Sequence, residues 1–177
     1  VQYIIRDTGD AYKRIDAIKA TGASLIVPLT FPEAQDVEDP FAADRVSLAD
    51  LKHWEMAPGN LAALEQAGIT FAITSGGDAK QFWKRLLTQA VKHGLSEQQA
   101  LAALTTVPAA MLRQSATLGR LQPGALANLI ITSAPLFDEE MAIEENWVAG
   151  DRYVVERHTE DRSGLYALTV GGRAFEL

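Results

Sequence analysis

Three short apolar runs, separated by helical patterns, constrain the fold of this 177-residue chain most strongly. The runs cover residues 3–5, 24–29 and 70–75 and are rich in Ile, Leu and Val. The middle run, Ser-Leu-Ile-Val-Pro-Leu, is typical of a strand buried on both faces. Helical patterns over 10–21 and 58–66 lie between the runs, and Gly22 and Gly68 are suited to end them. This alternation predicts parallel βα units.

Two further helices are predicted after the third run. Asp78 is expected to cap the first, whose apolar stripe includes Phe82 and Leu86 and which ends at Gly94. Residues 96–99, Ser-Glu-Gln-Gln, form a capping box that begins the second. Pro108 starts one more turn, over 109–112. We expect these helices to cover the sheet.

The pattern changes after Ser115. Residues 128–132 predict a strand, and the segments 146–148 and 152–155 flank a turn at 149–151, which predicts a hairpin. Residues 165–170 and 173–177 predict two more strands, joined by Gly171-Gly172. The chain therefore divides into an α/β part, 1–115, and a small antiparallel β part, 116–177.

A long acidic connection, about 31–57, separates the second run from the second helix. From 33 to 50 it carries six acidic residues against one basic residue, Arg45. A connection of this length is usually functional or disordered. Two interpretations stay open: a solvated surface insertion, or a lid over a site at the C-terminal ends of the strands. Ser47 and Asp50 predict that a short helix begins within it.

Composition excludes several classes of protein. There are 16 Lys and Arg residues against 23 Asp and Glu, a net charge of −7, which argues against binding the phosphate backbone of nucleic acid. The absence of cysteine excludes disulfides, thiolate zinc sites and cysteine nucleophiles. No apolar run approaches the roughly 20 residues of a membrane span. We expect a soluble protein of the cytoplasm or periplasm.

Four motifs resemble the amidohydrolase superfamily. Residues 119–130, Gly-Arg-Leu-Gln-Pro-Gly-Ala-Leu-Ala-Asn-Leu-Ile, resemble the segment that follows the barrel in that family, with Asn128 where Asp is common. Residues 101–109 resemble a helix junction of the family, and 147–150 resemble its hairpin. Residues 67–74 resemble the approach to its eighth barrel strand. The motifs follow the family's order and spacing over about 57–155.

The resemblance implies the C-terminal part of an imidazolonepropionase-like metal-dependent hydrolase. Residues 1–115 would hold the last three βα units of a TIM-type (β/α)8 barrel, and 116–177 would be part of a small composite β-sandwich. The chain begins with Val1 rather than Met, and we expect it to be a piece of a longer protein. Such a parent would hydrolyse a C–N bond of a small amide, cyclic amide or peptide substrate, using one or two zinc-like divalent metals at the barrel mouth.

The positions at which the family places ligands in this half are vacant. Its metal-binding Asp at the end of strand eight corresponds to Gly76, and its strand-six His has no counterpart in 6–8, Arg-Asp-Thr. Asp78 is left as the candidate catalytic residue, although helix capping is its expected role. No residue is expected to ligate a metal, so we expect no tight metal binding by this chain alone.

The remaining polar candidates have ordinary explanations. The histidines are too far apart for a local metal motif, and we expect each to be solvated or near a helix end: His53, His93 and His158. Ser75 lacks the G-x-S-x-G surroundings of a nucleophile. Gly76-Gly77 is either a tight turn or an anion cradle. Three large side chains are expected to be packing residues: Trp54, Met56 and Trp83.

Three hypotheses follow. The chain is part of a hydrolase and inactive alone, or a non-catalytic amidohydrolase-like binding or scaffolding module, or an unrelated small α/β domain joined to a β-rich module. The first predicts exposed apolar edges, and an oligomer or a partner chain that supplies the rest of the barrel. The third predicts a stable monomer.

Overall fold

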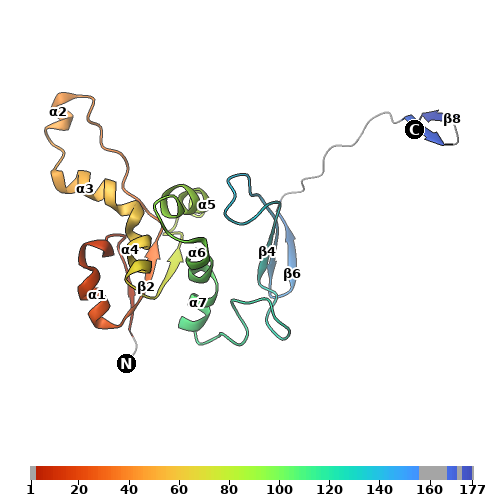
Figure 1. Ribbon diagram of the computed structural model, residues 1–177, viewed down its shortest axis with the longest axis horizontal. Helices are drawn as coiled ribbons and strands as arrows, with labels where there is room; N and C mark the ends of the chain where they lie inside the picture. The colour runs from red at the N-terminus through yellow and green to blue at the C-terminus, as the bar shows by residue number, and fades with distance from the viewer. Residues whose placement is uncertain (1–2, 156–166, 171–172, 177) are drawn as a thin grey trace.

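A parallel sheet forms the N-terminal part of the computed structural model, which describes residues 3–155, 167–170 and 173–176 (Figure 1). Its strands are β1 (Ile4–Arg6), β2 (Ser24–Pro28) and β3 (Phe71–Thr74), in that order. Both pairings are parallel, with Ile5 beside Leu25 and Ile26 beside Ala72. The predicted parallel βα arrangement is therefore confirmed.

Helices connect and follow these strands. Between β1 and β2 lie η1 (Ala11–Arg14) and α1 (Ile15–Thr21), and before β3 lie η2 (Ala57–Gly59) and α4 (Asn60–Gln66). After β3 come α5 (Phe82–Arg85), η3 (Leu86–Val91), α6 (Glu97–Leu104) and α7 (Thr106–Met111). The helix predicted over 82–91 changes at Leu86 into the π-helical stretch η3. Helix α7 begins two residues before Pro108, whose missing N–H costs nothing in a first turn.

The core lies between the sheet and these helices. Alternate residues of β2 and its extension point to it, because side chains of a strand alternate between faces. The largest side chains that are almost completely buried are Leu25, Val27, Leu29, Leu61, Leu64, Phe71, Leu86 and Leu95. Helix α6 packs against β3 with Ala100 and Ala103 facing the core. Small side chains at these positions let the helix approach the sheet closely.

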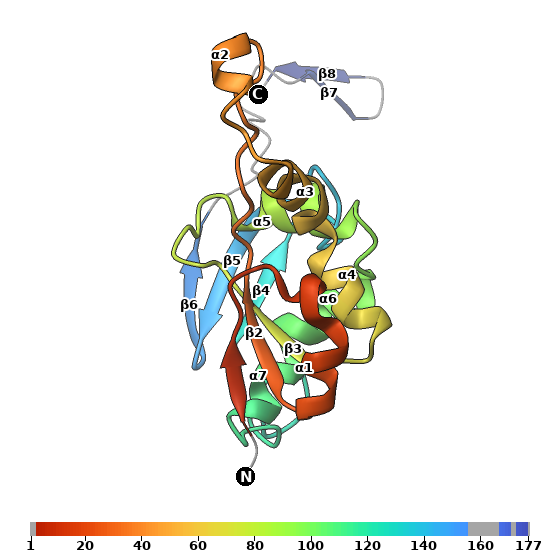
Figure 2. The ribbon, with the colours of Figure 1, turned by 90° about the vertical axis from the view of Figure 1, so that its left-hand side faces the viewer.

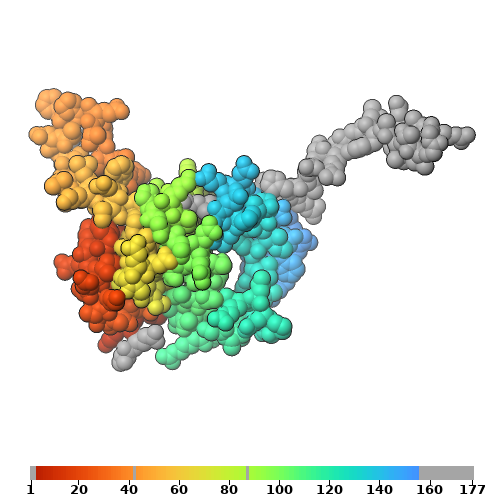
Figure 3. Space-filling view, in the orientation of Figure 1, coloured from red at the N-terminus to blue at the C-terminus, as the bar shows by residue number. Residues whose placement is uncertain are grey.

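Residues 33–56, called the arm below, extend from the carboxyl end of β2 (Figure 2). In the space-filling view, the arm projects from the rest of the N-terminal part (Figure 3). The arm contains α2 (Pro40–Ala43) and α3 (Leu48–Met56). The predicted helix start is confirmed, because the Ser47 hydroxyl accepts a hydrogen bond from the Asp50 backbone N–H, 3.1 Å away. Helix α3 buries no residue, so the expectation that Trp54 and Met56 are packing residues is wrong; their exposed fractions are 45% and 51%.

A second, antiparallel sheet contains β4 (Leu129–Thr132), β5 (Ile143–Val148) and β6 (Asp151–Val154). The hairpin turn places Ala149 and Gly150 at φ 52° and 94°, as a type I′ turn requires. The Asn128 side-chain oxygen accepts a hydrogen bond from the Ala149 N–H, 2.6 Å away. The amide at position 128 therefore keeps an acceptor oxygen where the resembling family commonly has a carboxylate.

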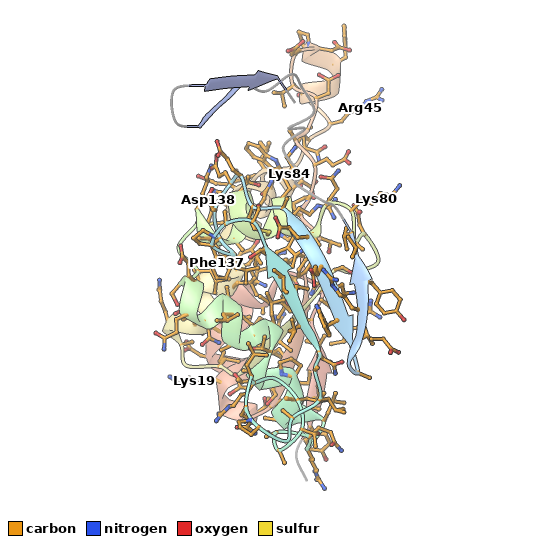
Figure 4. All side chains as sticks on the ribbon, turned by 90° about the vertical axis from the view of Figure 1, so that its right-hand side faces the viewer. Lys19, Arg45, Lys80, Lys84, Phe137 and Asp138 are labelled. Atoms are coloured by element: carbon orange, nitrogen blue, oxygen red, sulfur yellow. The ribbon has the colours of Figure 1, made fainter. Side chains whose placement is uncertain are left out.

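The loop between β4 and β5 of the second sheet contacts the N-terminal part of the chain. Phe137, labelled in Figure 4, packs against the core cluster. The Lys92 ammonium forms an ion pair with the Glu139 carboxylate, with Nζ and Oε1 2.5 Å apart. One large apolar side chain and one surface ion pair thus link this loop to the N-terminal part.

Strands β7 (Ala167–Val170) and β8 (Arg173–Glu176) pair antiparallel with each other, as predicted. Gly171-Gly172, His158 and the ends of the predicted strands at 165–166 and 177 lie outside the described residues. Within the described ranges, no helix is long and apolar enough to cross a membrane.

Candidate functional site at the carboxyl ends of the strands

The three parallel strands bring their carboxyl ends to one edge of the sheet, where α/β proteins commonly place their sites. Asp7 follows β1, Thr30 lies just beyond β2, and Ser75 follows β3. The backbone N–H of Asp7 donates to Ile26, and that of Leu29 donates to Thr74, each at 2.9 Å. These bonds extend the strand pairing, so the three segments are held side by side.

Asp7 belongs to a polar network centred on Asn60. The Asn60 side chain is almost completely buried, with an exposed fraction of 2%. Its amide nitrogen donates to the Asp7 carboxylate at 3.2 Å, and its oxygen accepts from the Tyr12 backbone N–H at 2.8 Å. A buried amide needs such partners, because an unpaired one is costly. Asn60 therefore fixes the start of α4 against the end of β1.

Tyr12 in turn holds the arm. Its hydroxyl lies 2.9 Å from Nδ1 of His53, and the two rings stack with centroids 6.0 Å apart. We expected His53 to be a surface residue; it is half-buried and makes a specific contact. Since His53 is on α3, this contact joins the arm to the β1 end of the sheet.

Asp10 lies beside this network and accepts hydrogen bonds from Thr8, at 2.5 Å, and from Lys13, at 3.4 Å. The Thr8 hydroxyl is the main reason that the pKa of Asp10 lies below its usual value. Burial opposes this effect by raising the pKa, and the Lys13 hydrogen bond and the charges of Lys13 and His53 lower it by smaller amounts. Asp10 is thus held in its ionised form by the residues around it.

The turn after β3 is closed against the neighbouring strand. Gly76 has φ +66°, and a β-carbon built there would lie 2.6 Å from Thr30 Cγ2 and 3.2 Å from Pro28 Cβ. Gly77 also has a positive φ, +101°. A side chain at position 76 would therefore be strained and would collide with Thr30. The sequence resemblance aligns this position with the metal-binding Asp of the family, and that alignment stays a prediction.

Asp78 has both carboxylate oxygens occupied. One accepts from the Gln81 backbone N–H at 3.2 Å, and the other lies 3.1 Å from the Arg85 guanidinium. The same guanidinium donates to the Leu29 carbonyl at 3.5 Å. Asp78 thus caps the turn before α5 and, through Arg85, ties it to the end of β2. These contacts describe a structural role, and Asp78 as a catalytic residue stays a prediction.

A cavity of about 580 Å³ lies at the base of the arm, between three segments. Phe31, Pro32, Glu33 and Ala34 line one side, Trp54, Glu55 and Pro58 another, and Arg85, Gln89 and His93 the third. Of the last three, Arg85 ends α5, Gln89 is in η3 and His93 follows η3. The cavity is called the arm-base cavity below. Its volume lies within the range of small-molecule sites.

The side chains at this edge do not fit a metal centre. Asp7 accepts from Asn60 and Asp78 from Arg85, and no group of three or more His, Asp or Glu residues that could hold a metal occurs in the part of the chain that the structure describes.

Sequence reasoning missed the residues that organise the edge. Their hydrogen bonds join residues that are far apart in the sequence: Tyr12 and Asn60 are 48 positions apart, and Arg85 and Leu29 are 56 positions apart. No local motif marks them, because an Asn at a helix start and an Arg on a helix are common in any protein. The Ser75 hydroxyl accepts a weak hydrogen bond from the Gly77 N–H at 3.4 Å, and it forms no hydrogen bond with a basic side chain in the part of the chain that the structure describes.

Comparison with known proteins supports one fold. No family model matches the chain, and no curated protein does. An amidohydrolase from Thermotoga maritima MSB8 matches 84% of this chain with a TM-score of 0.64 and 23% identity. A prolidase solved with N-methylphosphonate-L-proline matches 87% with a TM-score of 0.57 and 16% identity, and a further amidohydrolase matches 87% with a TM-score of 0.60 and 15% identity.

The chain therefore shares its fold with part of these amidohydrolase structures. It spans only 36–41% of the length of the structures it matches. At identities below 25%, the likeness concerns the fold and leaves activity and substrate open.

Proposed function

We propose that this chain is the C-terminal region of an amidohydrolase-fold hydrolase that acts on a C–N bond and that the chain is inactive by itself. The observation that carries the proposal is the extent of the match: 84–87% of this chain corresponds to 36–41% of each amidohydrolase structure. A chain that equals about two-fifths of an enzyme lacks most of the strands that such a fold uses for ligands. The metal-binding residues of the parent would lie on those strands.

In this proposal, residues 1–115 are the last three βα units of a (β/α)8 barrel, and residues 116–177 are part of a composite β-sandwich. The exposed β1 supports it. Strand β1 is an edge strand of the sheet, and Ile4 and Ile5 are 46% and 42% exposed. Apolar side chains on a free strand edge favour pairing with another strand. The remaining barrel strands, in the same protein or a partner chain, would supply it.

The substrate class in this proposal is a small amide, cyclic amide or peptide. The prolidase among the matched structures was solved with a phosphonate derivative of proline. Transfer of that chemistry to this chain rests on fold likeness, so it is the part of the proposal that most needs an assay.

The test compares this chain with the longer protein that contains it. Both are assayed for release of product from N-acyl amino acids, dipeptides and cyclic amides, with bound metal measured on the same samples. The proposal predicts turnover by the longer protein and none by residues 1–177. Turnover by the 177-residue chain, or an inert longer protein with its metals bound, would overturn it.

A second candidate, a non-catalytic amidohydrolase-like binding or scaffolding module, is favoured by Gly76. Thr30 and Pro28 occupy the space that a ligand side chain at position 76 would need. Asp7 and Asp78 are already used in structural hydrogen bonds. A longer protein that keeps a His-x-His pair and binds metal stoichiometrically favours the hydrolase. One that binds no metal and turns over no amide favours the module.

A further inference from the structure

The arm-base cavity is lined by a short segment after β2, by the end of α3 and Pro58 of η2, and by three residues from α5, η3 and the turn after η3. It lies beside the carboxyl end of β2, since Arg85 on its wall reaches the Leu29 carbonyl. Neither the capping by Asp78 nor the Asn60 network explains why an aromatic and two carboxylates meet there.

The charges of the lining do not cancel. Glu33 and Glu55 form no salt bridge within the described residues. Arg85, which would offset one of them, is already paired with Asp78. Lys80 and Arg45, labelled in Figure 4, are not part of the lining. The cavity therefore carries an excess of negative charge.

His93 adds an acceptor. Its Nδ1 lies 2.6 Å from the Gln89 backbone carbonyl, which only accepts hydrogen bonds, so Nδ1 carries the proton. In the neutral ring, Nε2 is then left with a lone pair. The cavity thus offers two carboxylates and one imidazole acceptor, whereas its guanidinium is engaged elsewhere.

Trp54 supplies an apolar wall. Trp54 is 45% exposed as a residue, although it lines the cavity together with Phe31, Pro32 and Pro58. An indole face attracts an organic cation within about 6 Å of its centroid. We propose that the arm-base cavity binds an organic cation, an ammonium or guanidinium group carried on a small apolar body. Its occupancy does not depend on hydrolysis, so it is testable separately from the proposed function.

The test titrates the isotope-labelled 177-residue chain with N-acetyl-arginine amide and follows backbone amide shifts by NMR. N-acetyl-citrulline amide, which has nearly the same shape without the charge, is the matched probe. We expect the arginine compound to shift residues 31–34, 54–58 and 85–93, and to bind at least about fivefold more tightly than citrulline. Added salt weakens the arginine binding, because the carboxylates are exposed.

Variants assign the effect to residues. Glu33→Gln and Glu55→Gln should each weaken binding of the arginine probe about threefold, the range of exposed charge pairs. Glu38→Gln, on the arm but outside the lining, should leave it unchanged. Trp54→Phe keeps the wall and should weaken binding less than Trp54→Ala. Butylguanidine is a second probe, which carries the guanidinium without a peptide backbone. Equal binding of butylguanidine would mean that the cavity recognises the free cation. Weaker binding would mean that it recognises the cation as a peptide side chain.

Three outcomes contradict the proposal. They are equal affinity for arginine and citrulline probes, shifts that map outside the cavity segments, and no shift at about 10 mM, beyond the millimolar affinity of a weak specific site.

Discussion

The Cγ2 methyl of Thr30 lies 2.6 Å from the point that a β-carbon on residue 76 would occupy. Contacts that short do not occur between a real β-carbon and its neighbours, so only glycine fits there. The two residues sit at the ends of adjacent strands, 46 positions apart in the sequence. Their contact shapes the edge at which a metal-binding amidohydrolase would present a carboxylate.

Replacing Gly76 by alanine tests this contact. At φ +66°, an added β-carbon costs about 1–2 kcal/mol in backbone strain alone. The collision with Thr30 adds about 1–3 kcal/mol, as overpacking does. We expect Gly76→Ala to lower the free energy of unfolding by the sum of these two costs. Urea denaturation of the variant and the parent chain measures this difference.

Gly68→Ala is the matched control. Gly68 has nearly the same φ, +69°, but nothing lies within 4 Å of its added β-carbon. Gly68→Ala should therefore lower the free energy of unfolding by the backbone strain alone. Thr30→Ser removes the colliding methyl, so it should recover part of the difference in a Gly76→Ala background. Equal losses for the two alanine variants would contradict the steric account.

Asn60 is predicted to be the main polar support of the strand edge. Asn60→Ala leaves the Tyr12 N–H and the Asp7 carboxylate without their partner. We expect a loss of about 1–3 kcal/mol in the free energy of unfolding and faster hydrogen exchange at the Tyr12 amide. Asn146→Ala, at an exposed position of β5, serves as the control and should change neither. An unchanged Tyr12 exchange rate would exclude this role for Asn60.

The ionisation of Asp10 gives a pH-dependent contribution to stability. Its pKa is lowered in the folded state, chiefly by the Thr8 hydrogen bond, so its stabilisation is present above the unfolded-state pKa and is lost as pH falls through the folded value. Thr8→Val should raise the pKa of Asp10 toward its ordinary value, as followed by NMR of the carboxyl carbon. Thr88→Val, whose hydroxyl donates to Lys84 instead, should leave that pKa unchanged. A pKa of Asp10 that shifts in Thr88→Val but not in Thr8→Val would contradict this account.

Two helix caps of the same chemistry should have different consequences. Ser96 caps the core helix α6 and also donates to the Glu65 carboxylate, from its N–H at 2.9 Å and from its hydroxyl at 2.5 Å. Ser96→Ala should therefore lower the global free energy of unfolding by about 1 kcal/mol or more. Ser47→Ala, in the exposed α3, should lower local helicity of the arm and leave global unfolding nearly unchanged. Equal global losses would show that the arm is part of the cooperative core.

The features that sequence analysis predicted correctly are those with local causes. The capping boxes at Ser47 and Ser96, the left-handed Gly22 and the hairpin turn at 149–151 each depend on residues fewer than five positions apart. The apolar run 24–29 predicted β2 because a doubly covered strand has to be apolar throughout.

The features that it missed depend on distant pairs. His53 contacts Tyr12, which lies 41 positions away in the sequence. Asp78 forms an ion pair with Arg85, whose guanidinium also reaches the Leu29 carbonyl at the end of β2. Trp54 was expected to pack inside, yet the arm buries no residue of α3. Hydrophobicity alone does not say whether a helix meets the core or stands away from it.

The most direct test of the account is a zinc titration of the 177-residue chain, with bound metal measured after dialysis and amide and dipeptide turnover assayed on the same sample. We predict that the chain retains far less than one equivalent of zinc and shows no turnover, because Gly76 offers no ligand and Asp7 and Asp78 are engaged by Asn60 and Arg85. Retention of a full equivalent of zinc, with turnover that Asp78→Asn abolishes, would contradict it.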